Sequence, residues 1–248
     1  IDNSSAFRMK KNVALVVPEI NSKDISKYKS RIIANPNCTT IISLMAIKPL
    51  YDLGLIKRIV ATSFQSVSGA GNLGMSELIL NTKKFIEGNK KNKNKVFEKN
   101  IAFNVIPKIG EITKNLYSEE EMKLHNESRK ILSDNKILIT ATTVRVPVIR
   151  SHSISLNIEF YKSISLNKAK KALSNFPGLQ LIGINQKMSY PTPSDCSNKD
   201  DCLVGRLRED YSVTNGLSLW VVGDQIRKGA ALNAVQIAES LQENLFLL

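Results

Sequence analysis

Strand-like and helix-like segments alternate along nearly the whole chain, and this alternation constrains the fold more than any other feature. Longer segments that favour extended backbone predict strands over residues 58–67, 137–148, 154–161, 203–209 and 217–222. Two short apolar segments predict strand edges at 13–17 and 32–34. Helices are predicted over residues 41–53, 119–132, 167–175 and 230–245. The order of these elements predicts an α/β or α+β architecture built on a mixed sheet.

The composition is that of a globular protein with an ordinary core. The 248 residues are 42% hydrophobic, and no apolar run approaches the roughly 18 residues that a bilayer span needs. The net charge of +13 suggests a polyanionic partner, but the densest basic cluster, residues 88–95, contains no Arg or aromatic side chain to hold nucleic acid. We therefore expect a solvated loop there, with neither a nucleic-acid nor a membrane partner.

Three cysteines, Cys38, Cys196 and Cys202, have no paired spacing. Neither histidine lies at metal-ligand spacing from them, so the sequence predicts no disulfide framework and no metal site. A reducing cytosol suits such a chain, and we expect a cytoplasmic protein.

Cys38 is predicted to lie at the N-terminus of a helix, within the motif Asn35-Pro-Asn-Cys-Thr-Thr40. Free backbone N–H groups and the helix dipole stabilise a thiolate at such a position, so we expect a lowered pKa and a nucleophilic sulfur. The alternative is a small buried hydrophobic side chain, which is the common role of a free cysteine. The polar neighbours on both sides favour the reactive role.

A cysteine nucleophile needs an acid or base beside it, and the chain has two histidines, His125 and His152. His125 falls on the predicted helix 119–132 among Lys and Glu, where a surface position is expected. His152 follows a predicted strand that contains Arg145, whose guanidinium suits a carboxylate. Cys38, Arg145 and His152 together suggest an acyl-transfer or aldehyde-oxidising site, with a structural His152 in a turn as the alternative.

Four sequence motifs are spread in order over nearly the whole chain. They are Asn35-Pro-Asn-Cys-Thr-Thr40, Ser63-Phe-Gln-Ser-Val-Ser-Gly-Ala-Gly71, Arg145-Val-Pro-Val-x-x-x-His152 and Gly223-Asp-Gln-Ile-Arg-Lys-Gly-Ala-Ala231. Together they closely resemble the aspartate-semialdehyde dehydrogenase family. The resemblance implies an enzyme that interconverts L-aspartate 4-semialdehyde and L-4-aspartyl phosphate, with NADP and inorganic phosphate, in the biosynthesis of lysine, threonine and methionine.

The resemblance also implies roles for residues at the matching positions. Cys38 is implied to attack the aldehyde and form a thioester, and His152 to act as acid and base near neutral pH. The residues implied to bind the substrate are Gln65, Glu120 on its ammonium group and Arg145 on its carboxylate. Those implied to bind phosphate are Arg8 and Lys123, and those implied to contact NADP are Ser68, Gly69 and Gln225.

The pair Glu120 and Lys123 can also be examined by helix geometry, because residues three apart share one face. Ser118 and Glu121 form a predicted capping box, which occupies Glu121 and leaves Glu120 and Lys123 to point jointly into a site. Without the resemblance, an exposed ion pair on the helix surface is the preferred interpretation.

The chain departs from the family pattern in its first residues. Members begin with a strand, a glycine-rich turn and a helix that bind the cofactor phosphates, and no such turn follows an N-terminal strand here. We expect residues 1–37 and 215–248 to be a remnant of a Rossmann-type NADP-binding domain, and 38–214 a mixed-sheet catalytic and dimerisation domain. The chain then corresponds to about the last two thirds of a longer enzyme, and we expect it to be inactive alone. The sequence does not decide between NADP and NAD as the preferred cofactor. The family's usual assembly implies a homodimer or a dimer of dimers.

Two alternatives differ from this interpretation in chemistry or in class. An N-acetyl-gamma-glutamyl-phosphate reductase-like enzyme uses the same Cys and His chemistry, but its substrate has no free ammonium group for Glu120 to bind. Its cysteine motif also usually has Gly where this chain has Asn37. The alternative outside enzymes is a non-catalytic basic dimerisation module.

Overall fold

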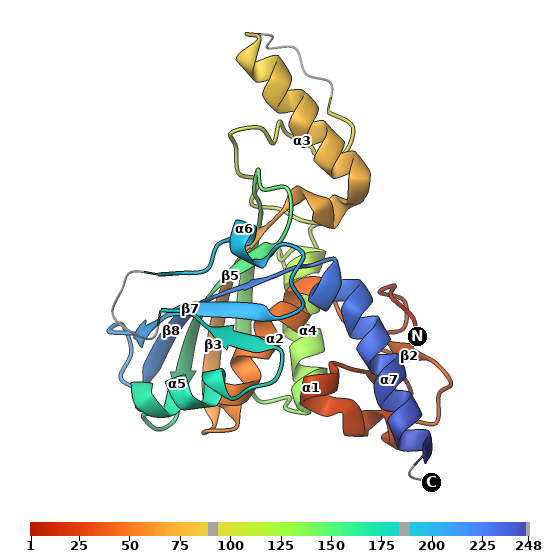
Figure 1. The fold of residues 1–248 in the computed structure, drawn as a ribbon, viewed down its shortest axis with the longest axis vertical. Coiled ribbons are helices and arrows are strands. Elements are labelled where there is room, and N and C mark those ends of the chain that lie inside the picture. Colours follow the sequence, from red (N-terminus) through yellow and green to blue (C-terminus); the bar gives the residue numbers. More distant parts are fainter. Residues whose placement is uncertain (89–93, 184–188, 247–248) are drawn as a thin grey trace.

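The computed structural model describes residues 1–88, 94–183 and 189–246, and its main feature is a six-stranded mixed sheet with helices packed against it (Figure 1). The strands of this sheet are β3 (Ile56–Gln65), β4 (Leu138–Arg145), β5 (His152–Phe160), β6 (Leu179–Leu181), β7 (Cys202–Glu209) and β8 (Gly216–Gly223). Their order is β4-β3-β5-β8-β7-β6, with β3 parallel to β4 and antiparallel to β5. The predicted mixed α/β architecture is confirmed.

A second, parallel sheet pairs β1 (Ala14–Leu15) with β2 (Ile33–Ala34). The helices in the described ranges are α1 (Pro18–Asn21), α2 (Cys38–Tyr51), α3 (Gly71–Ile86), α4 (Glu119–Leu132), α5 (Leu166–Ser174), α6 (Pro193–Cys196) and α7 (Leu232–Phe246). Short 3-10 turns form η1 (Ser22–Lys27) and η2 (Val67–Ala70), and a π-helical turn forms η3 (Arg227–Ala231). The predictions of α2, α4, α5 and α7 are therefore confirmed to within a few residues.

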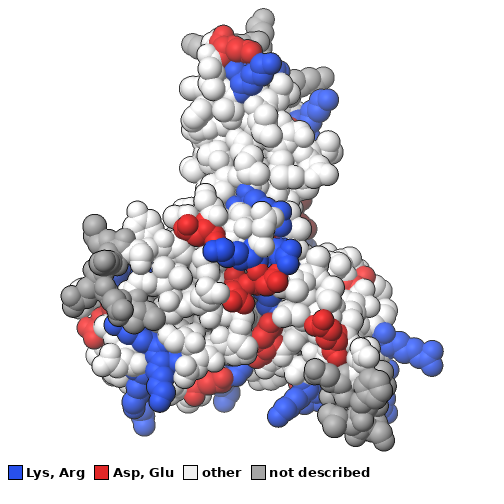
Figure 2. Space-filling model, viewed as in Figure 1, with Lys and Arg blue, Asp and Glu red and all other residues white. Residues whose placement is uncertain are grey.

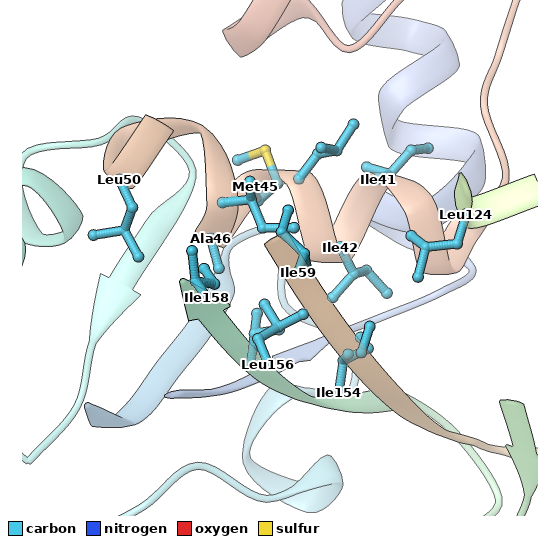
Figure 3. Close-up of a cluster of buried hydrophobic side chains, with 14 of the residues drawn as sticks. Ile41, Ile42, Met45, Ala46, Leu50, Ile59, Leu124, Ile154, Leu156 and Ile158 are labelled. Carbon is cyan, nitrogen blue, oxygen red and sulfur yellow. The ribbon is translucent and has the colours of Figure 1, made fainter. Parts of the chain in front are cut away.

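Helix α2 forms the centre of the core against one face of the large sheet. Its side chains are buried on nearly every side, and β5 presents alternate apolar residues to it, because successive side chains of a strand point to opposite faces. The close-up in Figure 3 labels members of this cluster from α2, α4, β3 and β5, among them Ile42, Met45, Leu124, Ile59 and Leu156. This packing fixes the N-terminus of α2, and with it Cys38.

The two ends of the chain form a smaller unit beside the main sheet. Helix α7 packs against α1 and η1, and a separate apolar cluster joins Ile237 of α7 to Ala14, Val16, Ile25 and Ile33. In Figure 1 both chain ends lie on this side of the molecule. Strand β8 lies in the middle of the six-stranded sheet, between β5 and β7. The division at residues 37 and 215 remains a prediction.

Helix α3 is the largest element that the sequence analysis did not predict. It projects away from the body at the top of Figure 1. Its first turn contains Gly71 and Gly74, so in sequence it resembles a glycine-rich turn. Its apolar side chains Leu73, Ile79 and Ile86 are exposed to solvent and do not form a buried face. Of the expected solvated loop at 88–95, residues 89–93 lie outside the described ranges.

Charged side chains are distributed over the molecule in several groups. On the face drawn in Figure 2, Lys and Arg occur in separated groups, with Asp and Glu beside the central one. None of the helices within residues 1–88, 94–183 and 189–246 is long and apolar enough to cross a membrane. These same ranges contain no cluster of three His, Cys, Asp or Glu side chains that could hold a metal ion.

Candidate active site

Cys38 is the first residue of α2, as the motif around it predicts. The side chain of Asn37 caps the helix by accepting the backbone N–H groups of Thr39 and Thr40 at 3.0 and 3.2 Å. The turn η3 packs tightly over this end, since a Cβ at Gly229 would lie 3.0 Å from the Cβ of Cys38. Cys38 is half-buried, whereas Cys196 and Cys202 are buried.

A single carboxylate, Glu120, connects several of the predicted site residues. Its Oε1 accepts hydrogen bonds from Asn37 Nδ2 at 2.9 Å and from Gln65 Nε2 at 3.3 Å. Its Oε2 pairs with Lys123 Nζ at 3.2 Å, and Glu120 is only 6% exposed. Glu121 is held in the predicted capping box with Ser118, which is confirmed. Glu120 is therefore a buried carboxylate and not half of an exposed surface pair, and its role toward the substrate remains a prediction.

His152 is fully buried at the start of β5, and its ring is held by Ser66. Its Nδ1 accepts the backbone N–H of Ser66 at 3.1 Å, and the Ser66 hydroxyl lies 3.1 Å from the same nitrogen. Because a nitrogen that accepts an N–H bears no proton, the neutral ring has its proton on Nε2. That Nε2 is buried without a hydrogen-bond partner among the described residues. The alternative of a turn position for His152 is wrong.

Burial and the neighbouring Arg145 cation hold the pKa of His152 well below its usual value of 6.5. The imidazole is therefore neutral at pH 7, and the expected titration near neutrality is wrong. Here it can donate a hydrogen bond through Nε2.

The thiol of Cys38 also differs from the expectation. Burial, together with the nearby charge of Glu120, raises the pKa of Cys38 to about 12. A hydrogen bond from Thr39 and the charge of Arg145 act in the opposite direction and are outweighed. The prediction of a lowered pKa is wrong, because desolvation exceeds the stabilisation that the helix terminus offers.

Arg145 ends β4 and is buried beside His152. Its Nη1 donates to the backbone carbonyl of Ser66 at 2.6 Å, so Ser66 contacts both Arg145 and His152. A Cβ at Gly69 would come within 2.8 Å of Arg145 Nη1 and 3.2 Å of His152 Cε1. The small size of Gly69 is thus required by the packing of these two side chains.

The residues predicted to contact the cofactor lie together. Gln225 Nε2 donates to the Ser68 hydroxyl, and Gln225 Oε1 accepts the backbone N–H of Ser151 at 2.7 Å. The Ser68 hydroxyl also lies 3.1 Å from that of Ser66, next to His152. The contacts of Ser68, Gly69 and Gln225 with NADP remain a prediction.

Of the two residues predicted to bind phosphate, Lys123 lies on α4 and Arg8 lies in the N-terminal segment. Arg8 donates to the backbone carbonyls of Asn35 and Asn3 at 2.9 and 3.0 Å and pairs with Glu127 at 3.2 Å. Lys123 is paired with Glu120, and its side chain is 32% exposed. Their role toward phosphate remains a prediction.

The sequence analysis missed Ser66 and Glu127. Glu127 is 1% exposed and accepts the backbone N–H of Asn37 at 2.7 Å in addition to its pair with Arg8. A signal for Glu127 was present, because it lies seven residues after Glu120 and therefore on the same face of a helix. Ser66 acts largely through its backbone, which the sequence does not reveal. His125, expected at the surface, is half-buried and bonds the carbonyl of Ile139 at 2.8 Å.

The chain is similar to known proteins in both sequence and structure. Residues 47–228 match the family described as "Semialdehyde dehydrogenase, dimerisation domain", and residues 1–28 match "Semialdehyde dehydrogenase, NAD binding domain". An aspartate-semialdehyde dehydrogenase from Synechocystis sp. is 51% identical over 247 residues, which are 100% of this chain and 72% of the relative. This chain belongs to the aspartate-semialdehyde dehydrogenase family. Membership places it among the oxidoreductases.

Other aspartate-semialdehyde dehydrogenases agree in sequence and in fold. The relative from Aquifex aeolicus is 47% identical over 97% of this chain and 71% of its own length. The crystal structure of aspartate semialdehyde dehydrogenase II from Vibrio cholerae has a TM-score of 0.93 and 44% identity, over 98% of this chain and 72% of that one. The fold is therefore that of this enzyme family.

Proposed function

We propose that this chain provides the catalytic and substrate-binding residues of an NADP-dependent enzyme that interconverts L-aspartate 4-semialdehyde and L-4-aspartyl phosphate through a thioester on Cys38. The observation that carries the proposal is the set of contacts around Glu120. This one carboxylate bonds the residue before the cysteine, Gln65 and Lys123. A Vibrio cholerae relative with 44% identity was solved as a complex with ASA, which supports the same substrate here.

Substrate binding follows from two buried charges of opposite sign. Arg145 offers a planar guanidinium that can hold the substrate carboxylate through two hydrogen bonds. Glu120 offers a carboxylate for the ammonium group, and Gln65, the last residue of β3, donates a hydrogen bond to that carboxylate. The charge of Glu120 raises the pKa of Cys38, so pairing it with a substrate ammonium would lower that pKa and favour the thiolate.

In the reductive direction, the Cys38 thiolate attacks the acyl carbon of the aspartyl phosphate, and the carbon–oxygen bond to phosphate breaks. A thioester and free phosphate result. When hydride adds to the thioester carbon, negative charge develops on its oxygen, and the Nε2–H of neutral His152 is suited to donate a hydrogen bond to that oxygen. The carbon–sulfur bond then breaks, which releases the aldehyde and restores the thiolate. The oxidative direction reverses these steps.

The residues near His152 suit a nicotinamide. Its Nε2 is buried without a partner among the described residues, and Ser68 and the side-chain-free Gly69 lie beside it. Bound NADP would supply the hydride or accept it. The match of residues 1–28 to an NAD-binding domain supports a nicotinamide cofactor, and we propose that this cofactor is NADP.

We also propose that residues 1–37 and the C-terminal part of the segment from residue 215 onward, which contains α7, form one cofactor-binding unit. Strand β8 of that segment then belongs with residues 38–214 to the catalytic and dimerisation domain, through which two copies pair. The apolar cluster that joins Ile237 to Ala14 and Ile33 supports the first part. The match of residues 47–228 to a dimerisation domain supports the second. Phosphate is proposed to bind Arg8 and Lys123.

The test is a spectrophotometric assay of NADP reduction with L-aspartate 4-semialdehyde and phosphate. The chain is assayed as it is and also fused to the part of the Synechocystis relative that the match does not cover. We expect turnover in the fusion, little or none in the chain alone, and loss in the fused Cys38→Ala variant. Cys196→Ala serves as the matched control and keeps activity. Undiminished activity in Cys38→Ala would contradict the mechanism.

A further inference from the structure

The arm formed by α3 and residues 94–110 contacts Arg145 in two ways. The guanidinium carbon of Arg145 lies 5.9 Å from the centroid of the Phe97 ring, within the range of a cation–π interaction. The backbones of Ile106 and Arg145 exchange two hydrogen bonds, of 2.9 and 2.8 Å. The arm therefore holds both the main chain and the side chain of the residue that ends β4.

Phe97 is itself fixed by a carboxylate on α3. Glu77 is 8% exposed and accepts three consecutive backbone N–H groups, those of Lys95, Val96 and Phe97, at 2.7, 2.7 and 3.1 Å. Backbone donors that converge on one carboxylate hold a segment firmly, because hydrogen bonds to a charged acceptor are strong. The ring also lies close to the first turn of α3, where a Cβ at Gly74 would come 3.3 Å from Phe97 Cζ.

A cavity of about 220 Å³ lies along this contact, lined by Phe97, Ile106, Lys108 and Arg145 among others. Arg145 has room to move toward the cavity, and burial already disfavours its charged form. The face of an aromatic ring offsets part of the cost of burying the charged guanidinium and restricts the orientations that this planar group can adopt.

We propose that Phe97 and Glu77 are positioning residues for Arg145. Glu77 fixes the backbone of residues 95–97, and Phe97 then holds the guanidinium in the orientation that receives the substrate carboxylate. The inference extends the proposed function, since it assumes that Arg145 binds that carboxylate. Its physical part, the restraint of Arg145 by Phe97, does not depend on the substrate.

The first measurement needs no activity. Phenylglyoxal modifies arginine side chains, and peptide mass spectrometry follows the rate at Arg145 in the purified chain. We expect Phe97→Leu and Glu77→Gln each to raise this rate about threefold, the size of a modest cation–π contribution. The double variant should be no faster than the faster single variant, because both act through one contact. Glu98→Gln, a neighbouring exposed carboxylate that pairs with Lys108, is the matched control and keeps the wild-type rate.

The second measurement uses the active fusion. We expect Phe97→Leu to raise the KM for L-aspartate 4-semialdehyde about threefold or more, with kcat and the KM for NADP changed less than about twofold. Unchanged reactivity of Arg145 in a Phe97→Leu protein with the wild-type urea midpoint would overturn the inference. A faster Arg145 reaction in a fusion that does not turn over the semialdehyde would support the restraint and count against the proposed function.

Discussion

The carboxylate of Glu127 accepts the backbone N–H of Asn37 at 2.7 Å, and this bond ties α4 to the cap of the helix that begins with Cys38. The other oxygen of Glu127 pairs with Arg8 at 3.2 Å. One buried side chain thus joins the N-terminal segment, the helix that begins with Cys38 and the helix that contains Glu120. Since Glu127 contacts neither Cys38 nor His152, its role is to hold these elements in place.

Replacement of Glu127 should destabilise the fold. Both partners of Glu127 are donors, so in Glu127→Gln the amide –NH2 must face either the Asn37 N–H or the Arg8 guanidinium, and Arg8 is left as a buried charge without its ion pair. We expect the free energy of unfolding to fall by about 3 kcal/mol in urea denaturation, as when one partner of a buried pair is removed. Glu119→Gln, an exposed carboxylate on the same helix, should change it by less than about 0.5 kcal/mol. Equal stabilities of the two variants would contradict this account.

The depressed pKa of His152 predicts a loss of stability in acid. Below pH 6.5 the unfolded chain takes up a proton on this ring and the folded chain does not, so the contribution of His152 is full above that pH and is lost as the pH falls. Between pH 7.5 and 5.5 the wild type should lose about 1.4 kcal/mol more than His152→Asn. The raised pKa of Glu127 acts with the opposite sign in both proteins and cancels. Parallel pH profiles from urea denaturation would refute the prediction.

The raised pKa of Cys38 predicts slow alkylation at neutral pH. Iodoacetamide reacts with the thiolate, and its rate at Cys38 should keep increasing well above pH 8. Glu120→Gln removes one cause of the raised pKa, and a shift of half a unit gives about threefold more thiolate at pH 8. Glu119→Gln is the control and should react as the wild type does. Rapid alkylation of the wild type at pH 7 would contradict this prediction, because it would show that the helix terminus outweighs burial and lowers the pKa of Cys38.

The sequence predicted the helix after Cys38 and every strand of the main sheet except the three-residue β6, because alternation, capping and helix spacing are local properties. Helix α3 escaped prediction, since most of its large apolar residues are exposed, with Leu78 buried, and its first turn contains two glycines. The pKa values of Cys38 and His152 could not be read from motifs, because they depend on burial and on Glu120 and Arg145 from distant segments. The contacts of the Ser66 backbone could not be predicted either, because they join Ser66 to His152 and Arg145, which are distant in the sequence.

The central claim is that Cys38 forms the acyl intermediate, and one half-reaction tests it without a nicotinamide. L-4-aspartyl phosphate, generated in place from L-aspartate by an aspartate kinase with ATP, should acylate Cys38 of the purified protein and release phosphate. Mass spectrometry of peptides after an acid quench locates the adduct. The account predicts one aspartyl group on Cys38, none on Cys196 or Cys202, and loss of the adduct in Cys38→Ser. An adduct on Cys196 or Cys202, or no adduct with intact aspartyl phosphate present, would contradict it.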